Sequence, residues 1–317
     1  MRSAVSSGIL LVDKPQGITS HDVVARTRRL AGTRRVGHAG TLDPMATGLL
    51  ILGVNSSTRL LTFLVGQDKE YVATIRLGQT TSTDDAEGDP VVTADPDTVA
   101  AVDDGSIASG IQALTGAISQ VPSSVSAIKV DGKRAYALVR AGEDVVLKPR
   151  PVTISTFELL ARREVGGFLD LDVRVECTSG TYIRALARDL GASLGVGGHL
   201  TALRRTRIGP FTVADAPALE NLDVAASLIG PADAASVLFP TLTLTEQAAT
   251  DLGHGKRIDA TGLGTIPEPG DDGLYAAVDP ARRLVGLVRV TDGVAKSAVN
   301  FPPDEPEQNT STEAAAE

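Results

Sequence analysis

The segment Gly37–Gly48 holds the residues best suited to chemistry in this sequence. It contains three glycines, one histidine (His38) and one carboxylate (Asp43). Glycines let a backbone approach a ligand closely and adopt positive φ, and Pro44 biases Asp43 toward extended geometry at the edge of a loop. A carboxylate placed there can act as a nucleophile. Spacing alone, however, favours a plain Asp-Pro turn with a capping carboxylate.

The sequence lacks the residues that are typical of several other reaction classes. Neither a phosphate-binding Gly-Lys-Ser/Thr loop nor a GxGxxG fingerprint is present. Cys177 is the one cysteine, which excludes an internal disulfide and a cysteine-rich metal site and fits a reducing cytoplasm. None of the four histidines are spaced four residues apart, so a zincin-type helix is absent. We therefore expect no metal and no cofactor.

Short elements must position the candidate loop. Gly8–Asp13 is an apolar run followed by a turn, which predicts a strand. Thr19 or Ser20 can cap a helix that runs to about Leu30. The remaining predictions are strands over Tyr71–Leu77, Val152–Leu160 and Leu169–Cys177, a helix over Tyr182–Leu194, and short strands over Leu274–Val278, Leu284–Val290 and Ala298–Phe301.

This pattern predicts a mixed α and β protein of about two domains. The chain has 317 residues, and its character changes after Pro240 to short strands between Asp/Gly/Pro turns. We expect a small β-rich domain up to residue 302 and a disordered acidic tail over 303–317. The apolar run near the N-terminus is too short for a signal peptide, and no stretch approaches the ~18 apolar residues of a membrane span.

Net charge alone argues against a nucleic-acid partner, because phosphate binding leaves a basic footprint. The chain carries a net charge of −9, but the charge is uneven. Residues 1–76 hold ten Lys/Arg and five Asp/Glu, whereas 81–109 and 304–317 hold acids and no base. Acidic blocks of this kind are usually solvated surface or tail, so a basic binding surface remains compatible with the sequence.

Gly37–Gly48 closely resembles the catalytic loop of the TruB family of tRNA pseudouridine synthases. Four other segments resemble motifs of that family in the same order. They are Gly8–Ser20, Lys69–Gly88, Ser179–Gly191 and Leu203–Phe211. The resemblance implies an α+β fold, with a largely antiparallel mixed sheet in a catalytic domain over 1–238 and a β-rich, PUA-like domain over 239–302.

The resemblance also implies a reaction and its catalytic residues. Asp43 aligns with the nucleophile that assists isomerisation of a T-loop uridine (position 55) of tRNA to pseudouridine, by attack at C1′ or at C6 of the base. Arg184 aligns with an arginine that pairs with this aspartate, and a fixed cation would lower the carboxylate pKa. Tyr71 aligns with a tyrosine that stacks on the base and handles a proton. From the residues alone, an aromatic on an alternating strand such as Tyr71 is usually a core residue, and spacing favours a helix-surface position for Arg184.

The resemblance also implies several substrate-binding residues besides the catalytic ones. Tyr182 and Leu203 would line the uracil pocket, and Asp85 would lie near it. His38 would occupy the space left by the flipped base. Gly40 and Thr41 of the loop would bind substrate, as would the cation Lys14. Further cations near the loop are Arg26, Arg28, Arg29, Arg34 and Arg35.

The expected partner is the tRNA T-arm stem-loop, bound by a cytoplasmic monomer that needs no protein partner and no membrane. The segment 119–150 resembles the family's insertion over the T-loop, but Ser123 and Val125 replace its usual proline and aromatic residues. The acidic pair Asp271-Asp272 argues against tight phosphate contact in the C-terminal domain. Three alternatives stay open: a non-catalytic RNA-binding protein or chaperone, a nucleosidase using Asp43 and Asp85, and a guide-RNA-dependent enzyme.

Overall fold

The fold is known from a computed structural model. The structure describes residues 5–123, 129–130, 133–134, 147–270 and 272–304. Much of the insertion expected over 119–150, and the expected tail from residue 305 onward, therefore lie outside the described residues.

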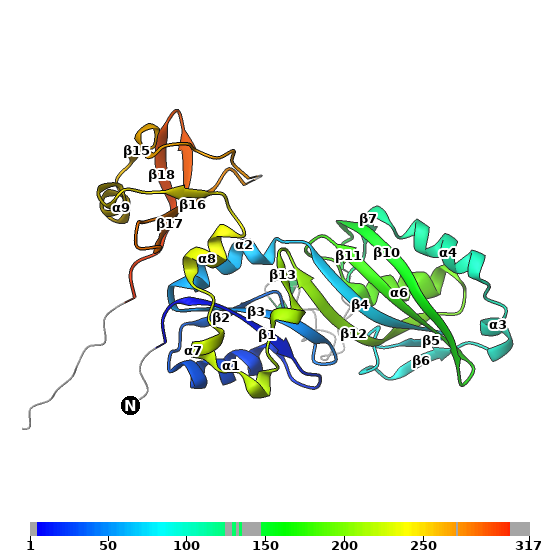
Figure 1. Ribbon diagram of the computed structural model, residues 1–317. Coiled ribbons are helices and arrows are strands. Elements are labelled where there is room, and N and C mark those ends of the chain that lie inside the picture. Colours follow the sequence, from blue (N-terminus) through cyan, green and yellow to red (C-terminus); the bar gives the residue numbers. More distant parts are fainter. Residues whose placement is uncertain (1–4, 124–128, 131–132, 135–146, 271, 305–317) are drawn as a thin grey trace, which may run out of the picture.

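A nine-stranded sheet forms the larger part of the molecule (Figure 1). Its main path runs β1 (Gly8–Lys14), β3 (Thr47–Val54), β12 (Gly198–Ile208), β4 (Lys69–Leu77), β11 (Phe168–Cys177), β10 (Arg150–Val165) and β7 (Gly116–Gln120). Two short strands, β2 (Val36–Ala39) and β13 (Phe211–Thr212), pair with β3 and β12. The pair β3–β12 is parallel and the other pairs are antiparallel. The predicted mixed, largely antiparallel sheet is confirmed.

Helices cover this sheet on different sides. Helix α6 (Ile183–Ser193) packs against β12 and contacts α4 (Asp104–Ala113), and together they bury one face of β4 and β11. Helix α1 (Ser20–Ala31) covers one face of β1 and β3, and α2 (Leu61–Val65) covers the other. Burial on both faces explains why β3 is an unbroken apolar run.

The helix predicted after the first strand forms with its predicted cap. The Thr19 side chain accepts from the backbone N–H of Asp22, and the Asp22 carboxylate accepts from the N–H of Thr19. This reciprocal capping box fixes the direction in which the chain leaves the β1 turn. The remaining elements of this part are the 3-10 helix η1 (Asn55–Leu60), β5 (Gln79–Thr81), β6 (Pro90–Thr93), α3 (Pro96–Ala100), β8 (Lys129–Val130), β9 (Lys133–Arg134), η2 (Val213–Asp215), η3 (Leu219–Asn221) and α7 (Val224–Ser227).

A five-stranded sheet forms the smaller part, beyond α8 (Pro231–Ser236) in Figure 1. Its strands run β14 (Thr241–Thr243), β16 (Tyr275–Val278), β17 (Leu284–Thr291), β18 (Val294–Asn300) and β15 (Ile258–Asp259), with α9 (Glu246–Gly253) against them and η4 (Thr261–Leu263) beside them. The two parts share a core through α8, where the Phe63 and Phe239 rings meet edge to face at 5.3 Å.

Two expected boundaries are wrong. Strand β18 starts at Val294 rather than Ala298, because the polar residues Lys296 and Ser297 hide the pairing with β17 in the sequence. Asp304 accepts from the backbone N–H of Ser7 at 2.8 Å, so it is held against the N-terminal strand and does not belong to a free tail.

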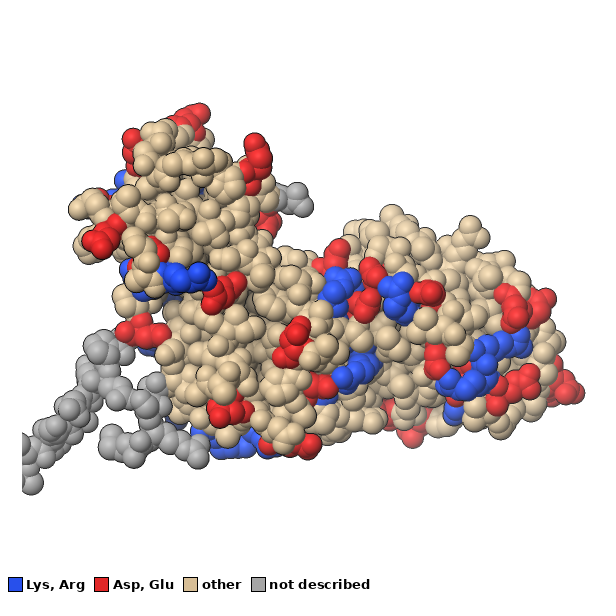
Figure 2. Space-filling model, in the orientation of Figure 1, with Lys and Arg blue, Asp and Glu red and all other residues tan. Residues whose placement is uncertain are grey.

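Cations and acids alternate on the outer face of the large sheet. Arg76 pairs with Asp170 at 2.8 Å, and Arg174 pairs with Glu158 at 2.9 Å. Figure 2 shows blue and red side chains next to one another on the right of the view, where the large sheet lies. Among the helices of the described ranges, none is long and apolar enough to cross a membrane.

Candidate active site

The loop that carries Asp43 runs between β2 and β3 and is held from several sides. The Ser20 hydroxyl donates to the carbonyl of Leu42 and accepts from its N–H, and the Gly17 N–H donates to the Pro44 carbonyl. At the end of the loop, Gly48 has φ +100°, and a Cβ there would lie 2.2 Å from the Arg205 carbonyl oxygen. Glycine is therefore required where β3 begins alongside β12.

Lys14 holds this loop from inside the protein. Its side chain is fully buried, and its Nζ donates to the carbonyls of Pro15 and Ile18, with a longer contact of 3.3 Å to that of Pro44. Burial lowers the pKa of Lys14 to about 8. The prediction that Lys14 contacts RNA is wrong, because the ammonium group does not reach the surface.

Three charged side chains from distant parts of the chain meet beside the loop. The Arg184 guanidinium, near the start of α6, lies 3.1 Å from the Asp43 carboxylate and 3.3 Å from the Asp85 carboxylate. It also donates to the Thr83 carbonyl. Arg184 and Asp85 are almost fully buried, whereas the side chain of Asp43 keeps 36% of its exposure. The arrangement fixes the guanidinium and leaves one carboxylate accessible.

The net effect on Asp43 differs from the expectation. Arg184 does lower the pKa of Asp43, as predicted, but desolvation of the carboxylate outweighs it and the neighbouring Asp85 charge adds to the desolvation. The pKa of Asp43 is therefore raised, and the expected lowering is wrong. A carboxylate whose charge is poorly solvated is a stronger nucleophile once it is ionised.

Asp43 lines a cleft of about 270 Å³ together with most of the residues expected to bind substrate. Tyr71 from β4, Tyr182 at the start of α6, and Leu203 from β12 form its walls. Gly40, Thr41 and Arg184 line it as well. Burial raises the pKa of Tyr71, so its hydroxyl stays protonated near neutral pH. A planar base fits between such aromatic and aliphatic walls.

Two expected substrate contacts, Asp85 and His38, are not among the residues that line the cleft. Asp85 is 2% exposed and accepts from the Thr83 hydroxyl and the Glu87 N–H, so it supports Arg184 from the inner side. His38 packs edge to face on His21 at 5.5 Å, and burial lowers the pKa of its imidazole. Its Nδ1 is buried and has no hydrogen-bond partner within the described part of the chain.

Arg205 is a residue that the sequence analysis missed. It is 1% exposed, and its guanidinium donates to the carbonyls of Leu49 at 2.8 Å and Gly40 at 3.0 Å. Its charge also lowers the pKa of Tyr71, against the larger opposite effect of burial. Arg205 thus joins the catalytic loop to β3. The run Arg204-Arg205-Thr206-Arg207 was the available signal, but it does not say which arginine points inward.

No group of three or more His, Cys, Asp or Glu side chains that could hold a metal ion occurs among the residues that the structure describes. The site offers a carboxylate, a guanidinium that fixes it, a neutral phenol and an aromatic-walled cleft. Such a site can stabilise and attack an electron-poor carbon of a bound planar base or of its sugar.

Three family models together match residues 28–302. They describe the TruB family pseudouridylate synthase N-terminal domain over residues 28–183, the tRNA pseudouridylate synthase B C-terminal domain over 184–248, and the tRNA pseudouridine synthase II C-terminal region over 239–302.

Similar proteins include two bacterial enzymes named tRNA pseudouridine synthase B. The one from Leifsonia xyli subsp. xyli is 63% identical, over 95% of this chain and 98% of its own. The one from an Arthrobacter species is 57% identical, over 94% and 97%. A crystal structure of a Cbf5-Nop10-Gar1 complex contains a chain with TM-score 0.69 and 25% identity, covering 93% of this chain and 85% of that one. A structure of an H/ACA RNP bound to a substrate RNA contains a chain of the same fold, with TM-score 0.67 and 24% identity. The match covers 93% of this chain and 85% of that one.

Proposed function

The chain belongs to the TruB family of pseudouridine synthases, and we propose that it isomerises the T-loop uridine at position 55 of tRNA, with Asp43 as nucleophile. Membership of the family makes it an isomerase of uridine in RNA. The position in tRNA and the role of each residue are the proposal. They are supported by the match to relatives named for tRNA and by the geometry of the cleft.

The observation that carries the proposal is the triad of Asp43, Arg184 and Asp85. Arg184 bridges two carboxylates, and only that of Asp43 lines the cleft. The carboxylate attacks C1′ of the ribose or C6 of the uracil, and the N1–C1′ bond breaks. The base turns, C5 bonds to C1′, the bond to the Asp43 carboxylate breaks, the C5 proton leaves and N1 gains a proton. The reaction is neutral in mass and redox state, so these steps require no cofactor.

The cleft walls assign the remaining substrate roles. Tyr71 lies against the flipped base and handles a proton during the rearrangement, while Tyr182 and Leu203 hold the ring. His38 fills the gap left in the RNA. The RNA backbone contacts the exposed arginines of α1 and the turn after it, which are Arg26, Arg28, Arg29, Arg34 and Arg35. Lys14 takes no part in RNA contact.

We further propose a catalytic domain over 1–238, an RNA-binding domain over 239–302, and a cytoplasmic monomer that acts on the tRNA T-arm alone. The protein named Cbf5 is found in a complex with Nop10 and Gar1. For this chain we expect no such requirement, because its 119–150 segment resembles the insertion of the stand-alone enzymes.

Incubation of the purified protein with an unmodified tRNA transcript tests reaction, substrate and site together. Pseudouridine is mapped nucleotide by nucleotide, and we expect a single product at position 55 without added partner or cofactor. Release of free uracil would indicate a nucleosidase. Tight binding without any product would indicate a non-catalytic RNA-binding protein, and product only with an added guide RNA would indicate the guided class.

A further inference from the structure

Gln120 is the buried residue of strand β7, which lies at one edge of the large sheet (Figure 1). Gln120 is 2% exposed, whereas the other residues of this strand are half-buried or exposed. Burying an amide that has no partner costs free energy, so a glutamine in this position is expected to make specific hydrogen bonds. The mechanism proposed above gives Gln120 no role.

Both ends of the Gln120 amide contact the backbone of Tyr182, far along the chain. The Nε2 group donates to the Tyr182 carbonyl at 3.0 Å, and Oε1 accepts from the Tyr182 N–H at 2.8 Å. Tyr182 is the N-cap of α6 and has extended backbone angles. Its carbonyl also accepts from the N–H of Leu186, which belongs to the first turn of the helix. The Gln120 amide therefore fixes the residue from which α6 begins.

The first turn of α6 also carries Arg184, two residues after Tyr182. The Arg184 guanidinium lies 3.1 Å from the carboxylate of Asp43 and 3.3 Å from that of Asp85. Because the hydrogen bonds of a helix turn join its residues, a change at the N-cap moves the arginine that follows it. Gln120 itself does not line the cleft, so any effect on the reaction passes through Tyr182 and Arg184.

The residues that follow β7 contact the same two elements of the site. The Val121 carbonyl accepts from the Arg188 guanidinium of α6 at 2.8 Å. The Ser123 hydroxyl donates to the Thr83 carbonyl at 3.3 Å, and this carbonyl also accepts from Arg184 at 3.0 Å. The chain that leaves β7 is thus held both by α6 and by the loop that supports the catalytic arginine.

We propose that Gln120 is a positioning residue for the reaction: its amide holds the Tyr182 backbone so that the Arg184 guanidinium meets the Asp43 carboxylate. Small displacements of a catalytic group lower a rate strongly. A side chain that only filled space here would be apolar, because an apolar group carries no cost of desolvating an amide. The part of Arg184 and Asp43 in turnover rests on the proposed function, whereas the link from Gln120 to α6 rests on the two hydrogen bonds.

Gln120→Leu removes both hydrogen bonds and keeps much of the side-chain volume. With saturating enzyme and unmodified tRNA, single-turnover formation of pseudouridine should fall about tenfold, while tRNA affinity stays within about twofold of wild type. Two control variants should keep the wild-type rate. Gln79→Leu removes an amide that bonds to the Thr93 hydroxyl in the β5–β6 hairpin, and Ile107→Val lowers stability by removing a buried methylene from α4.

The pKa of Asp43 gives a second readout, which needs no catalysis. In the RNA-free protein it is measured from the ¹³C chemical shift of the carboxyl group, assigned with Asp43→Asn. The charges that act on this carboxyl include those of Arg184, Asp85 and Lys14. A displaced Arg184 lowers the pKa of Asp43 less, so the titration should move to higher pH in Gln120→Leu. If the wild-type protein forms no pseudouridine, the proposed function fails, and this titration still decides the inference.

Gln120→Glu separates positioning from packing, and it keeps the test open if Gln120→Leu does not fold. A protonated carboxyl group can make both bonds to Tyr182, whereas an ionised one can only accept. Burial raises the pKa of such a carboxyl, so the ratio of the wild-type rate to the Gln120→Glu rate should rise with pH. A ratio that does not change with pH, or an unmoved Asp43 titration in Gln120→Leu, would overturn the inference. Equal loss of rate in Gln120→Leu and Ile107→Val would overturn it as well.

Discussion

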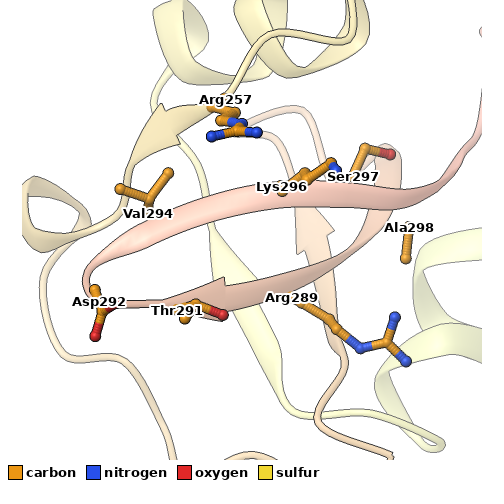
Figure 3. A pocket seen from close by; sticks show the side chains of 8 residues that line it. All are labelled: Arg257, Arg289, Thr291, Asp292, Val294, Lys296, Ser297 and Ala298. Atoms are coloured by element: carbon orange, nitrogen blue, oxygen red, sulfur yellow. The ribbon is translucent and has the colours of Figure 1, made fainter.

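The cations of the catalytic cleft differ in the partners that the fold gives them from three cations that line the groove of the smaller sheet, Arg257, Arg289 and Lys296 (Figure 3). Arg184 and Arg205 are buried, and each contacts groups of the protein itself. Arg289 and Lys296 are exposed, lie opposite one another on neighbouring strands and have no carboxylate partner within the described residues. A buried, partnered cation organises the site, whereas an exposed, unpartnered one is available to a ligand. Charge type alone does not separate the two.

Replacing arginine by lysine separates these two roles most strongly. Arg184→Lys keeps the charge but loses the fork that reaches Asp43 and Asp85 together. Single-turnover isomerisation should fall about 100-fold or more, with a much smaller change in thermal midpoint. Arg289→Lys, at an exposed residue without an ion pair in the described ranges, should leave both turnover and thermal midpoint close to wild type. Wild-type turnover in Arg184→Lys would contradict the proposed pairing.

The buried ammonium of Lys14 makes the free energy of unfolding depend on pH. Its pKa is lowered from 10.5 to about 8, so the unfolded chain binds more protons between those values and stability rises with pH there. Lys14→Met removes this contribution. The difference in free energy of unfolding between wild type and Lys14→Met should change by on the order of 3 kcal/mol from pH 8 to 10.5. Parallel stability curves in urea titrations would contradict the burial of this charge.

The acid limb of the pH–rate profile tests the coupling between the carboxylates of Asp43 and Asp85. Because the pKa of Asp43 is raised, single-turnover rates should rise with pH through a value above the ordinary 3.8. Asp85 contributes to this rise. Asp85→Asn should therefore move the limb to lower pH, while tRNA affinity, which depends on exposed arginines, changes little over the same range. An unmoved limb would mean that Asp85 does not act on Asp43.

The smallest effect concerns the acidic C-terminus. Deletion of residues 305–317 removes four carboxylates but keeps Asp304, which contacts Ser7. We expect unchanged turnover and, at low salt, tRNA binding tighter by up to about threefold, because these carboxylates and the RNA phosphates carry like charges, whose repulsion is screened at higher salt. Weaker binding of the truncated protein in the same titration would give these residues a positive role.

Much of the cleft could be predicted because its residues lie in long motifs. Asp43, Tyr71, Arg184, Tyr182 and Leu203 come from segments far apart in sequence and line one cleft. Local patterns also predicted the first strand, the capped helix α1 and the β10–β11 hairpin. Periodicity and capping are local properties, so the sequence carries them directly.

The features that escaped prediction depend on burial or on strand register. Lys14 and Arg205 look like surface cations in the sequence, and only the folded core shows that carbonyls surround them. The pKa direction of Asp43 depends on how far desolvation exceeds the charge of Arg184. Arg257, just before β15, falls beside Lys296 and Arg289 only because of the register in which β15, β18 and β17 pair, and no local pattern encodes that alignment.

The central claim is that Asp43 is the nucleophile of a tRNA isomerase, and Asp43→Asn tests it most directly. The fold favours the protonated form of Asp43, since the pKa of this carboxyl is raised. The stability that protonated Asp43 contributes is lost as pH rises through its pKa. Asp43→Asn should therefore be at least as stable as wild type near neutral pH. With saturating enzyme and unmodified tRNA, we predict wild-type affinity and no pseudouridine at position 55. Pseudouridine formed by Asp43→Asn at the wild-type single-turnover rate would contradict the account.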